Sequence, residues 1–77
     1  MATIHRIGKV EIRIYRRGEH PPPHVHVDGP DTRAQVAIAD GSIIQGFLPT
    51  KLARRVREWL KDNRAAVLAQ WNNITGL

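Results

Sequence analysis

Hydrophobic and polar positions alternate along the first part of the chain. Residues 9–16 read KVEIRIYR, which places valine and isoleucine on one side of an extended backbone and Glu11, Arg13 and Tyr15 on the other. A period of two in a stretch rich in β-branched residues is typical of a half-buried strand. The alternation returns in HVHV and RAQVAIA and then in the apolar stretch SIIQGFL. We therefore predict strands at about 9–16, 24–28, 33–39 and 42–48.

Two glycines mark features of this predicted sheet. Asp40-Gly41 separates the third and fourth predicted strands, and a tight hairpin turn requires a positive φ that glycine adopts without strain. Gly46 lies inside the fourth strand, where a glycine often marks a β-bulge. The fourth strand is therefore expected to return antiparallel to the third.

After Pro49 the spacing of apolar residues changes from two to three and four. Leucine, valine and tryptophan recur at the steps typical of an amphipathic helix that packs on a sheet. Thr50 is a plausible N-cap, and Asp62-Asn63 interrupts the apolar stripe. We predict two helical segments, 51–62 and 64–74. The order ββββαα gives an α+β fold, in which an antiparallel sheet of three to four strands is covered on one face by C-terminal helix.

The size and composition indicate one small domain, 1–77. The chain has 77 residues and no cysteine, so it has neither disulfides nor thiolate metal ligands. No apolar run is long enough for a signal peptide or a membrane span. We therefore expect a cytoplasmic protein that is not bound to a membrane.

Positive charge is concentrated toward both ends of the chain. The net charge is +5, and the acidic residues outnumber the basic ones only between residues 18 and 50. A basic protein of this kind favours nucleic acid or an acidic partner protein, although a solvated helix face has the same composition. The candidate binding residues lie on the first strand and the helix: Arg13, Arg16, Arg17, Arg54, Arg57 and Lys61.

The segment GEHPPPHVHVDG holds three of the four histidines. His24 and His26 fall on the same side of a strand, opposite the predicted apolar face, about 6–7 Å apart. His20 or Glu19 is near enough in the sequence to add a third ligand. His20, His24 and His26 are therefore a candidate site for zinc or a similar divalent metal.

Two other interpretations use the same histidines without a metal. Imidazole titrates near neutrality, so two histidines can act as acid and base in phosphodiester cleavage while Arg13 or Arg33 holds the phosphate. Alternatively, the histidines only support the fold, and the three prolines stiffen the approach to the strand. For a catalytic role the candidate residues are Glu19, His20, His24 and His26.

Three stretches of the chain together resemble a known family. They are RIYRRGEHPPPHVHV, VAIADGSIIQGFLP and VREWLKDNRAAVLAQW. The pattern E-H-x-P-P-H-x-H-V, a strand pair ending in G-x-L-P and a helix with V-x-E-W-L are similar to the bacterial family called domain of unknown function 4160. The resemblance implies a bacterial protein, often encoded beside another short protein in arrangements that look like toxin–antitoxin pairs. It implies no particular activity.

Two functional hypotheses follow. The first is a binding module that contacts nucleic acid or an acidic partner protein through its basic surfaces; in the arrangement that the resemblance implies, it would be one component of a toxin–antitoxin-like pair. The second is a histidine-dependent nuclease or other phosphodiester hydrolase, assisted by a metal or acting by acid–base chemistry.

Overall fold

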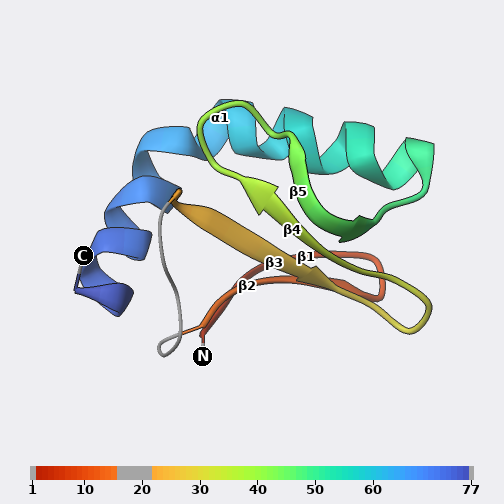
Figure 1. The fold of residues 1–77 in the computed structure, drawn as a ribbon, viewed down its shortest axis with the longest axis horizontal. Coiled ribbons are helices and arrows are strands. Elements are labelled where there is room, and N and C mark those ends of the chain that lie inside the picture. The colour runs from red at the N-terminus through yellow and green to blue at the C-terminus, as the bar shows by residue number, and fades with distance from the viewer. Residues whose placement is uncertain (1, 16–21, 77) are drawn as a thin grey trace.

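A five-stranded antiparallel sheet is followed by one long helix in the computed structural model, which describes residues 2–15 and 22–76 (Figure 1). The predicted α+β class is confirmed. The sheet order β1-β2-β3-β4-β5 follows the chain order. The elements are β1 (Ala2–Ile7), β2 (Val10–Ile14), β3 (His24–Asp28), β4 (Arg33–Ala37), β5 (Ile43–Phe47) and α1 (Thr50–Thr75).

The strand β1 was not predicted. It pairs with β2 through a turn at Gly8, whose φ of 60° suits a residue without a side chain. The pairing is irregular between Thr3 and His5. This irregularity breaks the period of two, so the polar and apolar residues of ATIHRI do not show the alternation by which the other strands were recognised.

The predicted antiparallel return of β5 along β4 is confirmed, and the pairings of β2 with β3 and of β3 with β4 are antiparallel too. In β2 and β3, Arg13 lies opposite His26 and Glu11 lies opposite Asp28. The turn between β4 and β5 includes Gly41, with a φ of 74°. Gly46 adopts a φ of 88° and pairs with Ala34, and the register irregularity of the β4–β5 pairing lies two residues earlier, between Ile43 and Gln45.

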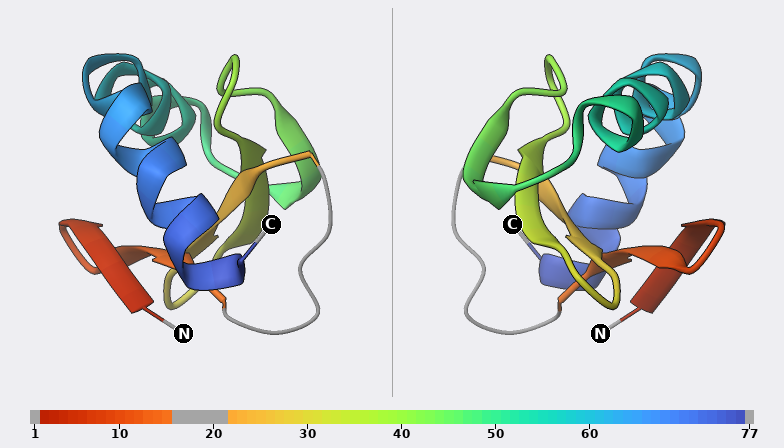
Figure 2. Two further views of the ribbon diagram at one scale, coloured as in Figure 1. Left: turned by 90° about the vertical axis from the view of Figure 1, so that its left-hand side faces the viewer. Right: turned by 90° about the vertical axis from the view of Figure 1, so that its right-hand side faces the viewer.

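The core lies between one face of the sheet and α1. Alternate residues of β2, β3 and β4 are fully buried, as the period of two predicted, and α1 covers them (Figure 2). Burying each of the valine and isoleucine side chains among them stabilises the fold by about 1.5–3 kcal/mol. The buried helical residues are Ala53, Val56, Leu60, Val67 and Trp71.

The prediction of two helices was wrong, because α1 is continuous across Asp62-Asn63. The Asn63 side chain donates a hydrogen bond to the Trp59 carbonyl, 2.8 Å away within the same helix. Arg64 Nε donates to the Ile38 carbonyl at 2.8 Å. Polar residues therefore occupy the gap in the apolar stripe without ending the helix, which curves around the end of the sheet (Figure 1).

The expected N-cap was also wrong. Thr50 is the first helical residue, and Pro49 occupies the N-cap position without a side-chain hydrogen bond. The helix ends at Thr75 and is capped by Gly76, whose φ of 73° is the left-handed conformation common after a last turn. Its backbone N–H donates to the Asn72 carbonyl at 3.0 Å.

The strands β1 and β5 form opposite edges of the sheet (Figure 2). In β5 all five residues are exposed, including the apolar side chains of Ile43, Ile44 and Phe47. In the part of the chain that the structure describes, no helix is long and apolar enough to cross a membrane.

Candidate functional site

The face of the sheet opposite the core carries a continuous polar cluster. Because side chains alternate along each strand, the register aligns two rows across β2, β3 and β4. One row is Arg13, His26 and Gln35, and the other is Glu11, Asp28 and Arg33. The sequence predicted that histidine, arginine, tyrosine and glutamate would share this face, and the register shows which of them are neighbours.

Glu11 is the centre of one set of contacts. Arg13 Nη2 donates to Glu11 Oε2 at 2.6 Å, and Arg6 Nη2 and the Thr3 hydroxyl donate to Oε1 at 3.3 and 3.0 Å. The hydrogen bond from Arg13 holds the pKa of Glu11 below its usual value. The same contact raises the pKa of Arg13. Arg13 is thus engaged within the protein, which lowers its availability to an external anion.

Asp28 is the centre of a second set of contacts. The Tyr15 hydroxyl donates to Asp28 Oδ2 at 2.5 Å, and this bond, with burial, raises the pKa of Tyr15. Asp28 Oδ1 is buried and receives no hydrogen bond from the described residues, although Arg33 Nε lies 3.7 Å away. Arg13 Nη1 is 3.9 Å from Oδ2. The Asp28 carboxylate therefore lies close to two cations and holds the Tyr15 hydroxyl.

The Tyr15 ring in turn positions His26. The two ring centroids are 4.0 Å apart and the planes are inclined by 32°. Both rings line a hollow of about 350 Å³ on the sheet face, which we call the sheet hollow. Its other lining residues are Arg33, Ala34, Gln35, Gln45 and Gly46. An imidazole, a guanidinium and two amides around one space can bind an anionic or hydrogen-bonding ligand.

His24 lies beside the sheet hollow but does not line it. The residue is only 2% exposed, and its Nδ1 is 2.8 Å from the Pro22 carbonyl oxygen. Its ring centroid is 5.0 Å from that of Trp71 and 5.2 Å from that of His26. The curved end of α1 thus covers His24, although alternation places it on the face opposite Val25. The two histidines are neighbours, but only His26 lines the sheet hollow.

The predicted metal site extends beyond the described residues. Among residues 2–15 and 22–76, no group of three or more histidine, cysteine, aspartate or glutamate side chains could hold a metal ion. Glu19 and His20 lie outside those ranges, as do Arg16 and Arg17. His24 and His26 supply two imidazoles, so a third ligand would have to come from the segment 16–21. The divalent-metal site stays a prediction.

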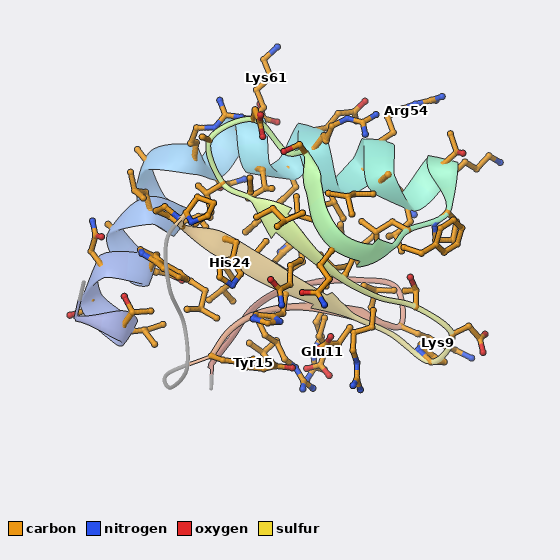
Figure 3. All side chains as sticks on the ribbon, viewed as in Figure 1. Lys9, Glu11, Tyr15, His24, Arg54 and Lys61 are labelled. Atoms are coloured by element: carbon orange, nitrogen blue, oxygen red, sulfur yellow. The ribbon has the colours of Figure 1, made fainter. Side chains whose placement is uncertain are left out.

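The predicted basic residues of the helix form a separate surface. Arg54, Arg57 and Lys61, here called the helix ridge, are all exposed. In the described part of the chain, no ion pair engages any of the three. Figure 3 shows Arg54 and Lys61 projecting away from the sheet, whereas Glu11 and Tyr15 lie on the opposite side of the molecule.

The sequence did not identify Gln35 and Gln45 as site residues or show that Asp28 holds Tyr15. Gln35 could have been identified from the sequence, because alternation with the buried Ala34 and Val36 places it on the polar face. Gln45 faces the same space because it lies opposite Gln35 in the register of β4 and β5. The bulge beside it disturbs the simple period of two, so this register could not be derived from alternation alone.

The fold and these two surfaces define a small α+β domain with a histidine-bearing sheet face and a basic helix. Residues 10–72 match the family described as domain of unknown function (DUF4160), and the chain belongs to this family. The resemblance drawn from the histidine motif is thereby confirmed at the level of the family. Comparison with curated proteins and with solved structures gave no match.

Proposed function

We propose that this domain is a nucleic-acid-binding module and that the helix ridge is its contact surface. The observation that carries the proposal is the availability of the ridge. Arg54, Arg57 and Lys61 are exposed and not engaged by ion pairs among the described residues. Arginine and lysine that are not neutralised by neighbouring carboxylates can replace the counterions of a phosphate backbone.

The spacing along the helix supports this function. Arg54 and Lys61 are seven residues apart, which is about 10.5 Å along the axis. A strand of B-form DNA advances about 3.4 Å per phosphate, so the ridge spans roughly three phosphates of one strand. The net charge of +5 adds long-range attraction to a polyanion.

The family resemblance supports a wider role for the binding module. As a component of a bacterial toxin–antitoxin-like pair, it would act in the cytoplasm and bind a small partner protein encoded nearby. An acidic surface on such a partner would compete with nucleic acid for the helix ridge. The partner would then control access to the nucleic acid.

The experiment is a titration of the full chain into fluorescently labelled RNA and duplex DNA at two salt concentrations. We expect binding that weakens with salt, and Arg57→Ala should make the log–log salt dependence on duplex DNA shallower by about 0.9. Lys9→Ala is the control, because it removes the same charge from an exposed position distant from the ridge (Figure 3). Absence of binding at low salt would exclude this function.

The sheet hollow supports a second candidate, a phosphodiester hydrolase. His26 and Arg33 line the same space, so an imidazole and a phosphate-binding guanidinium are available together. One histidine would take the proton of a ribose 2′-hydroxyl, and a second, His24 or His20, would protonate the leaving oxygen. Glu19 would assist, as would a divalent metal bound by His20, His24 and His26.

This second candidate is tested with the double substitution His24→Ala/His26→Ala. A hydrolase would lose RNA cleavage while its nucleic-acid binding through the helix ridge persisted. A stable double variant with the full biological effect would show that the histidines are structural. Metal analysis of protein purified without a histidine tag separates the metal-assisted reaction from acid–base catalysis.

A further inference from the structure

A groove lies between the first hairpin and the N-terminal half of α1, and the proposed role of the helix ridge gives this groove no function. One hollow of about 460 Å³ lies between β1 and the helix and is lined by His5, Arg6 and Trp59 among others. A second, of about 640 Å³, continues toward Lys51 and Arg54. The two share Ile7, Arg55 and Glu58, so they form one continuous groove, here called the β1–α1 groove.

The charges of this groove are unevenly distributed. Four cations line it, Arg6, Lys51, Arg54 and Arg55, against the two carboxylates of Glu58 and Asp62. Three of the four cations line the hollow toward the start of the helix, where Glu58 is the one carboxylate. That end therefore favours phosphate groups, and it is continuous with the helix ridge because Arg54 belongs to both.

The other end of the groove carries an aromatic pair. The His5 and Trp59 rings are stacked, with centroids 4.5 Å apart and planes inclined by only 9°. Trp59 also packs against the core, so His5 is the outer member of the stack. Both residues are half-buried and line the groove. A nucleobase placed on the outer side of His5 would become the third aromatic group of this stack.

We infer that the β1–α1 groove binds single-stranded nucleic acid, with phosphates beside Lys51, Arg54 and Arg55 and a base stacked on the His5–Trp59 pair. A cationic groove next to an aromatic platform is the arrangement by which proteins bind single strands without reading their sequence. A duplex keeps its bases stacked on one another and cannot offer one to His5. The inference rests on the proposed nucleic-acid binding and names the form of nucleic acid that is bound.

The experiment compares a 12-nucleotide RNA strand with the duplex of the same sequence, using the full chain. The strand should bind more tightly and should quench tryptophan fluorescence through Trp59, because Trp71 is 1% exposed. His5→Ala should weaken binding of the strand roughly fivefold or more, whereas His5→Phe should retain most of it. Loss of binding in both variants would contradict stacking on this residue.

Two charge-removing variants test the path of the backbone. Arg55→Ala should make the salt dependence of strand binding shallower by about 0.7 in the log–log slope, whereas Lys9→Ala should leave it unchanged. Lys9 is also exposed, but it lines neither hollow of the groove and is not part of the helix ridge. If Arg55→Ala leaves strand binding unchanged while Arg57→Ala on the helix ridge weakens it, the groove is excluded and nucleic-acid binding stands. If the chain binds neither probe, the proposed function itself fails.

Discussion

Replacing Tyr15 by phenylalanine tests whether the polar cluster on the sheet holds the fold together. The substitution removes the hydroxyl that donates to Asp28 at 2.5 Å and retains the ring that stacks on His26. A hydrogen bond to a charged group contributes about 1.5–3 kcal/mol. Because Arg13 and Arg33 remain within 4 Å of the Asp28 carboxylate, we expect the lower end of this range, about 1.5–2 kcal/mol.

The measurement is urea denaturation followed by circular dichroism, with thermal unfolding as a second readout. For a domain of this size, the loss corresponds to a melting temperature lower by roughly 6–16 °C. In an Asp28→Asn background the same tyrosine substitution should cost only the ~0.5–1.5 kcal/mol of a neutral hydrogen bond. Equal losses in both backgrounds, or no loss in the wild-type background, would refute the reasoning.

The pH dependence of this difference has a definite sign. The folded protein raises the pKa of Tyr15 above its ordinary value of 10.0. Stability from a group with a raised pKa is fully present below the unfolded value and is lost as the pH rises through the folded value. The stability difference between wild type and Tyr15→Phe should therefore be constant near neutrality and should shrink above about pH 10.

Three further substitutions, two of them with a comparison variant, test other parts of the structure. The hydrogen bond from Arg13 lowers the pKa of Glu11 below 4.5, so wild type should have a larger free energy of unfolding than Glu11→Gln above pH 4.5. In urea denaturation at decreasing pH, this difference should disappear as the pH falls through the lowered pKa. Gly8→Ala should cost ~1–2 kcal/mol in the same assay, because a Cβ at Gly8 meets nothing within 4 Å and only the left-handed backbone is strained. Gly46→Ala should cost well more than this, because a Cβ at Gly46 would lie 2.2 Å from the Arg33 carbonyl oxygen. Trp71→Ala should cost about 3–5 kcal/mol in denaturant unfolding. Phe47→Ala should cost far less, because its side chain is 67% exposed, and equal losses would contradict the assigned core.

Most of the fold could be predicted because its core obeys simple periods. The alternation in KVEIRIYR placed Ile12 and Ile14 in the core, and both are fully buried. The break assigned to Asp62-Asn63 shows where such patterns mislead. Arg64 there contacts the Ile38 carbonyl, a partner 26 residues away that no local pattern reveals.

The candidate site was predictable in its composition but not in its geometry. Alternation placed His26, Arg13 and Tyr15 on one face, yet the hydrogen bond from Tyr15 to Asp28 depends on the register between β2 and β3. The burial of His24 depends on the curvature of α1, which brings Trp71 to its ring. In the β1–α1 groove, Arg6 is more than forty residues from the basic residues of the helix, and β1 itself was not expected.

The order of the elements has a consequence for synthesis. Every strand pairs with its neighbour in the chain, so each hairpin can form soon after it has been translated. The apolar face of the sheet, however, is covered only by α1, the last element made. A nascent chain that ends before Thr50 exposes Ile12, Val25 and Val36 to any other unfinished chain. Stable folding must therefore wait for the helix, and until then the exposed apolar face makes the growing chain prone to aggregation.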